Sequence, residues 1–123
     1  MRYLTDRKRA EGKGASGTGT EHHWFMTVTA VALAFLVPVF LIIFGRALGQ
    51  GQEQVVATFA RPFPAIVTAL TLFVAMRHFA KGAQIMIEDY ARGTARKIGI
   101  IAVTSLSYAV IATGLFALAK IAL

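Results

Sequence analysis

Two long stretches of the chain, 24–45 and 98–119, contain no charged residue. Each has 22 residues, and at about 1.5 Å per residue a helix of this length spans roughly 33 Å. The hydrocarbon core of a bilayer is about 30 Å thick, so we predict transmembrane helices over 24–45 and 98–121. Pro38 lies inside the first of them and is expected to bend it, which a helix packed among others in a membrane tolerates.

The middle of the chain has a third apolar stretch, which basic residues interrupt. Pro62 and Pro64 suit the first turn of a helix, where their missing amide donors would have had no partner. We predict one helix over 62–88, a third span with ionisable groups at depth: Arg77, His78 and Lys81. In the preceding loop, 46–61, three apolar residues at helical spacing predict a short interfacial segment: Val55, Val56 and Phe59.

The composition supports a membrane protein. Of the 123 residues, 56% are hydrophobic and only 15% are charged, with a mean hydropathy of +0.61. A soluble domain has about a quarter of its residues charged, and a disordered chain is poor in apolar residues, so both classes are excluded. The absence of cysteine excludes disulfides and thiolate-bound metals. The predicted fold is an all-α membrane protein with three transmembrane helices, which we expect to pack with a partner subunit into a helical bundle.

The formal net charge of +7 concentrates at the ends of the predicted spans. The polar tail 1–23, which we expect to be flexible, has five basic residues, and the loop 89–97 has three more. The opposite side has only three, namely Arg46, Arg61 and Lys120. This asymmetry predicts a cytoplasmic N-terminus and 89–97 loop, and a periplasmic 46–61 loop and C-terminus. Because the excess charge flanks apolar runs, orientation in a membrane explains it better than a nucleic-acid partner does.

One face of the middle span combines an imidazole, a glycine and a carboxylate. At about 100° per residue, the eleven steps from His78 to Asp89 return to within about 20° of the same direction, and Gly82 lies on this stripe. The rise between His78 and Asp89 is about 16 Å, close to half of the hydrocarbon thickness. With Asp89 and Tyr90 at the cytoplasmic interface, His78 lies near the middle of the membrane.

Ionisable residues at this depth are expensive and are therefore functional candidates. An imidazole without an acid within one turn of its own helix suits axial ligation of haem iron. Gly82 would let a flat macrocycle approach the backbone. Lys81 and Arg77 are candidates for contacts with haem propionates, but both also suit snorkelling towards headgroups, and Arg77 suits a neighbouring helix. Asp89 and Tyr90 could hydrogen-bond a small polar headgroup.

The spacing H-x3-G-x6-D-Y, formed by His78, Gly82, Asp89 and Tyr90, resembles the second helix of the small hydrophobic (D-type) anchor subunit of succinate dehydrogenase, respiratory complex II. The start of the first span, EHHW at 21–24 and VTAVA at 28–32, is similar to the same subunit. Members of that family often have a basic residue where Thr27 stands. The resemblance covers nearly the whole chain.

The resemblance implies a role for three of the matched residues. His78 corresponds to one axial ligand of haem b, the other coming from the second, cytochrome b-type anchor subunit. Tyr90 corresponds to the tyrosine that hydrogen-bonds the ubiquinone carbonyl, and Asp89 to the aspartate that holds a partner arginine at that site. The expected partners are this second anchor, an iron–sulfur subunit and a flavoprotein subunit that oxidises succinate. The expected location is the bacterial cytoplasmic membrane.

Other interpretations remain open from the residues alone. His78 could be a neutral histidine bonded between helices, Tyr90 an ordinary interfacial aromatic residue, and Asp89 a partner of Arg92. A proton-coupled transporter or channel subunit could use His78, Asp89 and Lys81 as a relay, but the uncharged runs 24–45 and 98–119 of the other two spans have no charged residue or histidine to continue it. An anchor of a quinol:fumarate reductase would share every feature above. His22 and His23 suit an interface better than a metal site, because adjacent residues of a helix point apart.

Overall fold

A computed structural model describes residues 3, 5–12 and 19–123. The described residues form helices and no strand, which confirms the predicted all-α class. Three of the helices are long and apolar enough to cross a membrane, as expected. The elements in chain order are α1 (Asp6–Glu11), α2 (Glu21–Ala47), α3 (Gln52–Ala60), α4 (Pro62–Tyr90) and α5 (Gly93–Ala122).

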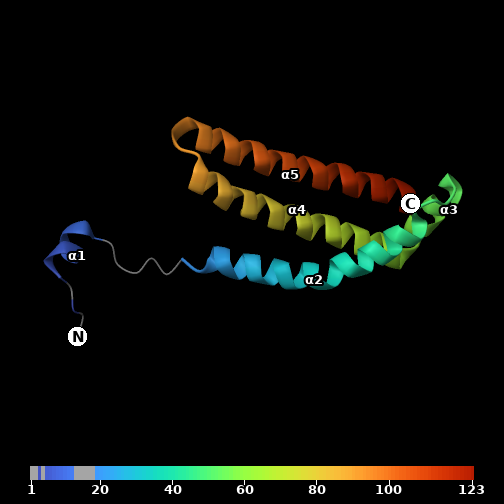
Figure 1. The fold of residues 1–123 in the computed structure, drawn as a ribbon, viewed down its shortest axis with the longest axis horizontal. Coiled ribbons are helices and arrows are strands. Elements are labelled where there is room, and N and C mark those ends of the chain that lie inside the picture. The colour runs from blue at the N-terminus through green and yellow to red at the C-terminus, as the bar shows by residue number, and fades with distance from the viewer. Residues whose placement is uncertain (1–2, 4, 13–18) are drawn as a thin grey trace.

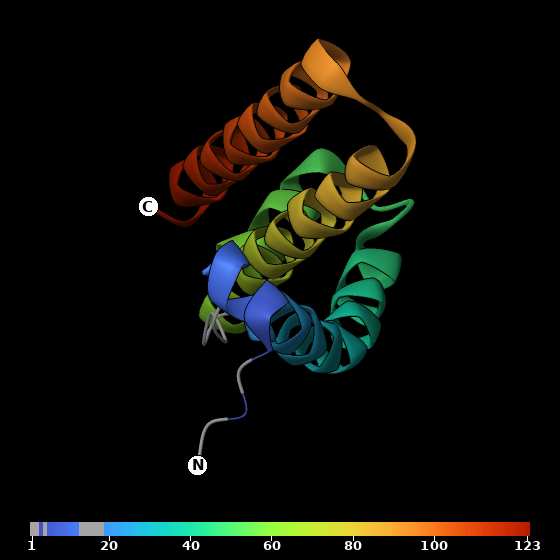
Figure 2. The same cartoon turned by 90° about the vertical axis from the view of Figure 1, so that its left-hand side faces the viewer.

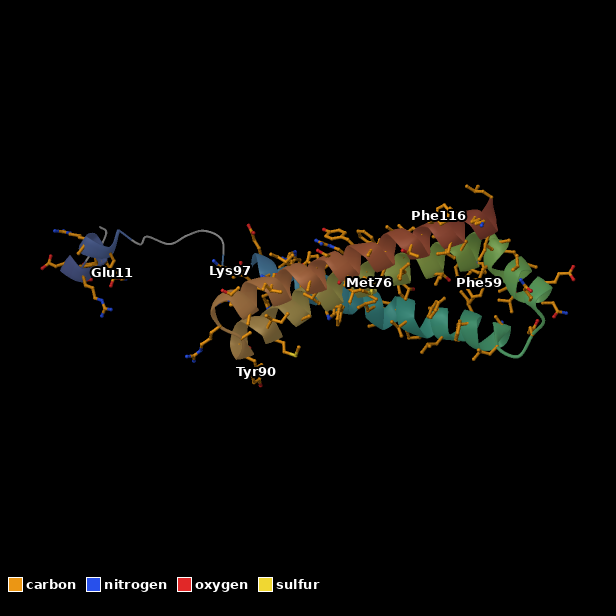
Figure 3. All side chains as sticks on the ribbon, turned by 90° about the horizontal axis from the view of Figure 1, so that it is seen from above. Glu11, Phe59, Met76, Tyr90, Lys97 and Phe116 are labelled. Atoms are coloured by element: carbon orange, nitrogen blue, oxygen red, sulfur yellow. The ribbon has the colours of Figure 1, made fainter. Side chains whose placement is uncertain are left out.

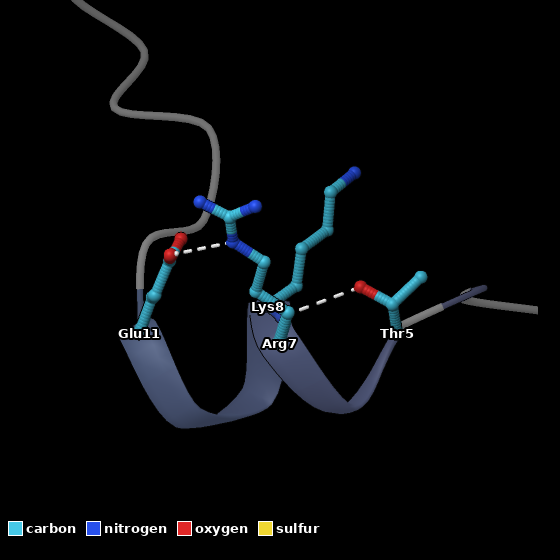
Figure 4. A network of polar contacts seen from close by, with 4 residues as sticks. All are labelled: Thr5, Arg7, Lys8 and Glu11. Carbon is cyan, nitrogen blue, oxygen red and sulfur yellow. Dashed lines mark hydrogen bonds and ion pairs between the residues drawn. The ribbon is translucent and has the colours of Figure 1, made fainter.

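The tail is more ordered than the sequence suggested. We expected 1–23 to be flexible, but α1 occupies 6–11 and α2 already begins at Glu21. Thr5 caps α1, because its hydroxyl oxygen accepts from the backbone N–H of Lys8 at 3.3 Å, and Arg7 pairs with Glu11 one turn on at 2.9 Å (Figure 4). These contacts stabilise a single short helix locally. The remaining part of this prediction, at 1–2, 4 and 13–18, lies outside the described residues.

The long helices also extend past the apolar runs that predicted them. In place of a loop over 89–97, α4 continues to Tyr90 and α5 begins at Gly93. The backbone N–H of Ala91 still bonds the Ile87 carbonyl at 2.8 Å, and Gly93 takes a positive φ of 60°, which lets the chain reverse at once. Helical hydrogen bonds do not depend on side-chain polarity, so the end of an apolar run does not mark the end of a helix.

The helix α4 is the centre of the structure. It packs against α2 on one side and α5 on the other, as Figures 1 and 2 show, and α3 packs across the end where α2 turns into α4. The start of α2 and the α4–α5 connection lie at one end of this layer, and the C-terminus lies at the other (Figure 1). Figure 1 also shows α2 changing direction part-way along, and Pro38 lies inside this helix.

Much of the apolar surface remains uncovered. Phe35 of α2 is 73% exposed and Phe116 of α5 is 68% exposed, whereas few residues, such as Val67 and Ile111, are buried between helices. Contiguous apolar surface on this scale is stable only against lipid or another apolar protein surface. The helices therefore form an open layer and not a closed bundle.

The contact between α4 and α5 is closely packed. Ser107 of α5 is only 1% exposed, and a Cβ added at Gly114 would collide with the Cδ2 methyl of Leu72. A small residue at 114 therefore allows the two backbones to approach, as is common where membrane helices pack.

Candidate functional site

All the residues singled out on the middle span belong to one continuous helix. His78, Lys81 and Gly82 lie in the second half of α4, and Asp89 and Tyr90 form its last turn. The helix has no interruption between them, so the separation of about 16 Å expected from helical rise applies. The structure thus brings the imidazole, the glycine and the carboxylate onto one face, and it places the phenol at the end.

His78 contacts α2 through one ring nitrogen. Its Nδ1 lies 2.7 Å from Oγ1 of Thr29. The same Oγ1 lies 2.8 Å from the carbonyl oxygen of Phe25 and 3.2 Å from that of Met26. The imidazole is therefore held against the neighbouring helix. This contact agrees with the alternative interpretation of His78, a histidine bonded between helices, at one of the two ring nitrogens.

The other ring nitrogen is open. Among the described residues, none forms a hydrogen bond to Nε2 of His78, and this atom is not one of the buried polar atoms without a partner, which are His22 Nε2 and Thr68 Oγ1. Nε2 is therefore accessible at the surface of this chain. An imidazole with Nδ1 engaged and Nε2 open is the arrangement that an axial haem ligand needs, so the residues present fit that group.

Gly82 lies one turn from His78 and also faces α2. A Cβ added there would meet only Cε of Met26, at 3.6 Å, which is an ordinary van der Waals contact. The packing of this chain therefore leaves room for alanine at 82. Any requirement for glycine at this position therefore has to come from a ligand or subunit outside the chain.

Arg77 and Lys81 lie on the side of α4 that faces α5. Nη1 of Arg77 donates to the hydroxyl of Tyr108 at 2.6 Å, and the guanidinium lies 5.7 Å from the centre of the Phe25 ring. Arg77 therefore contacts both neighbouring helices, which is the last of the three roles expected for it. Together with Lys81, Gln84 and Tyr108 it lines a cavity of about 310 Å³. The propionate contacts of Arg77 and Lys81 stay predictions.

The last turn of α4 carries open polar groups. Tyr90 is 88% exposed, its side chain stands at the edge of the structure in Figure 3, and among the described residues its hydroxyl has no hydrogen-bond partner. Asp89 is also exposed and forms no ion pair with Arg92 in the described part of the chain. Instead, Glu88 accepts from Gln84 at 2.9 Å and lies 3.6 Å from Arg96 of α5.

The two adjacent histidines of α2 differ in exposure. His22 is half-buried and His23 is exposed, and in the described part of the chain no group of three or more histidine or acidic residues could hold a metal ion. His22 does have a buried Nε2 without a partner.

Sequence reasoning missed Thr29 and Tyr108. Both are polar residues inside charge-free runs, and this is the signal that could have singled them out. The signal is weak, because Thr27, Thr104 and Ser107 share it.

The fold and these contacts define a class before any comparison. The chain is a small multi-pass membrane protein whose central helix carries an imidazole with one coordinating nitrogen open and a phenol at the end of the same helix. Over residues 1–117 it matches the family described as "Succinate dehydrogenase/Fumarate reductase transmembrane subunit", and the chain belongs to this family. The resemblance noted from His78, Gly82, Asp89 and Tyr90 is thereby confirmed at the level of the family.

One curated relative is similar over the whole chain. It is the protein of Paracoccus denitrificans named "Succinate dehydrogenase hydrophobic membrane anchor subunit", with 54% identity over 123 residues, which cover 100% of this chain and 95% of that protein. No solved structure matches the chain.

Proposed function

We propose that the chain is a membrane-anchor subunit of a succinate:ubiquinone oxidoreductase, in which it supplies one axial ligand of haem b and part of the ubiquinone site. It has no catalytic centre of its own and also docks the soluble iron–sulfur and flavoprotein subunits. The observation that carries the proposal is His78, whose Nδ1 is bound to α2 and whose Nε2 is open, about 16 Å along α4 from an unpartnered phenol.

His78 would hold the iron through Nε2, with Gly82 one turn away leaving the helix surface flat beside it. Haem b bound there would supply a one-electron redox centre. The chain has only three histidines, and the other two, His22 and His23, lie in the first turn of α2. The second axial ligand must therefore come from another chain, which is the role of the second, cytochrome b-type anchor.

Tyr90 and Asp89 would form this chain's part of the ubiquinone site. A phenol can donate a hydrogen bond to a quinone carbonyl, and Asp89 can orient a cationic group of the partner anchor. Both residues lie at the end of the layer where α2 starts and α4 turns into α5, which the charge asymmetry assigns to the cytoplasm. Electrons from the soluble subunits would arrive on that side.

The open apolar faces of α2 and α5 support a partner within the membrane. A three-helix layer with such side chains as Phe35 and Phe116 exposed can pack with further helices of a second anchor. The transporter alternative lacks this support, since the family is that of an electron-transfer complex and the apolar stretches of α2 and α5, 24–45 and 98–119, have no charged residue or histidine to continue a relay from α4.

The name of the relative supports one direction of the reaction. The family description covers succinate dehydrogenases and fumarate reductases, whereas the 54% identical protein is named for the former. We therefore favour succinate oxidation over fumarate reduction.

The decisive experiment replaces the ligand in the purified four-subunit complex. We expect His78→Ala to remove or strongly alter the haem b Soret band, because it removes one of two axial bonds. His23→Ala, on the exposed end of α2, is the matched control and should leave the spectrum unchanged. A His78→Ala complex with the spectrum of the wild type would overturn the proposal.

A further inference from the structure

We propose that Thr29 is a positioning residue for haem ligation: its hydroxyl fixes His78 as the tautomer with the proton on Nδ1 and directs Nε2 out of the chain. This inference rests on the proposed function, in which Nε2 binds iron. Nothing in the resemblance assigns a role to Thr29. The position of the single hydroxyl proton of Thr29 decides which ring nitrogen of His78 carries a hydrogen.

The proton of Thr29 points at its own helix. Its Oγ1 lies 2.8 Å from the carbonyl oxygen of Phe25, and two oxygens so close repel each other unless a hydrogen lies between them. A hydroxyl has one proton and two lone pairs, so Oγ1 is left to act as an acceptor towards His78. Nδ1, at 2.7 Å, must then carry the hydrogen and donate it. In a neutral imidazole this leaves the lone pair on Nε2, the nitrogen that no described residue engages.

The bond has two consequences for the imidazole. It fixes the rotation of the ring about its bond to Cβ, so that Nε2 has one direction in place of several. It also lets Oγ1 draw the Nδ1 proton, which increases the basicity of Nε2 as a ligand. The acceptor is itself polarised, because Thr29 donates to the Phe25 carbonyl. A stronger nitrogen donor favours the oxidised iron, so the contact should lower the reduction potential of the haem.

Thr29 is set apart from the other hydroxyl residues of the helices. Thr27, Thr71, Ser107 and Thr113 each donate to the carbonyl four residues earlier on their own helix and have no second partner among the described residues. That contact is a common local feature of helical serine and threonine. Among the serines and threonines that the structure describes, only Thr29 has a hydroxyl that also reaches another helix. Thr27, two positions away on α2 and exposed, is therefore a natural control.

The test compares three variants in the purified four-subunit complex. Thr29→Val is nearly isosteric and removes the acceptor, Thr29→Ser keeps it, and Thr27→Val removes the local contact alone. The measurements are the haem reduction potential, the electron paramagnetic resonance spectrum of the oxidised haem, and the rate of haem transfer to apomyoglobin. Loss of an outer partner of a metal-bound histidine typically weakens binding about 10–100-fold.

We expect Thr29→Val to retain haem, to raise its reduction potential, to shift its resonance spectrum, and to increase the haem transfer rate about tenfold. Thr29→Ser and Thr27→Val should match the wild type. Thr29→Val with wild-type potential, spectrum and transfer rate would overturn the inference. If Thr29→Val does not assemble, Thr29→Ala provides the same measurement. Failure of both, with Thr27→Val intact, would mean that the hydroxyl serves folding and would also overturn it.

These outcomes separate the two claims. If His78→Ala loses the haem while Thr29→Val behaves as the wild type, the proposed ligand stands and the role of Thr29 falls. If His78→Ala retains the haem, the proposed function falls and the role of Thr29 falls with it.

Discussion

The two faces of α4 differ in how far this chain satisfies its own side chains. On the face towards α5, the guanidinium of Arg77 reaches the Tyr108 hydroxyl, and Leu72 occupies the space that a side chain at Gly114 would need. On the face towards α2, His78 has one nitrogen bound and one open, and Gly82 has no neighbour that requires glycine.

This difference separates residues that pack the three helices together from residues that are available to bind a ligand or subunit outside the chain. On the α5 side, contacts within the chain explain Gly114, which packs against Leu72, and Tyr108, whose hydroxyl accepts from Arg77. Gly82 and Tyr90 of α4 have no such explanation. Tyr90 and His78 are positions to which the resemblance gives a role. The contrast provides matched pairs of substitutions.

The largest effect on stability is expected at Gly114. Gly114→Val would force its side chain into Leu72, and overpacking of this kind costs about 1–3 kcal/mol. The thermal midpoint of the purified complex should fall clearly. Because the collision is with a single side chain, Leu72→Ala in the same chain should restore part of the loss. An undiminished midpoint for Gly114→Val would show that the α4–α5 contact is looser than its geometry indicates.

The pair of tyrosines should separate function from packing. Tyr90→Phe removes an open phenol, and we expect ubiquinone reduction to fall about tenfold, or about 1.4 kcal/mol, with succinate oxidation by an artificial dye intact. Tyr108→Phe removes the acceptor of Arg77 and should instead lower the free energy of unfolding by about 1 kcal/mol, measured as a lower thermal midpoint. Equal loss of both activities in Tyr90→Phe would indicate misassembly and contradict a role at the quinone.

The smallest effect on stability is expected at Gly82. Gly82→Ala meets only the flexible side chain of Met26 and gains helix propensity, so the free energy of unfolding should stay the same or rise by up to about 1 kcal/mol, with a thermal midpoint that is unchanged or higher. Haem content and the Soret band should nevertheless change, because the added methyl occupies the approach of a flat ring. Gly114→Ala is the control, with the opposite pattern of a lower midpoint and normal haem. Normal haem in Gly82→Ala would remove this glycine from the haem site.

The helical fold could be predicted because its signal is local. An apolar run long enough to cross a bilayer can be recognised without knowledge of its neighbours. The three long helices therefore followed from 24–45, from 98–121 and from 62–88, although Arg77 and Lys81 interrupt the last of these runs. The connections were predicted less well. The expected loop at 89–97 shrank to Ala91 and Arg92, because polar residues can continue a helix whose backbone bonds are already satisfied. A helix also appeared at 6–11, which has no apolar pattern.

The sequence by itself determined that the chain is helical and lipid-facing, and it placed His78, Gly82, Asp89 and Tyr90 at fixed positions along one helix, since helical geometry depends only on spacing. The tertiary structure decided which threonine of α2 meets the imidazole and which tyrosine of α5 meets Arg77. Thr27 and Thr29 are the same residue type, and each donates to the carbonyl oxygen four residues earlier on α2. Only the rotation of α2 against α4 distinguishes them, and that rotation depends on packing between distant parts of the chain.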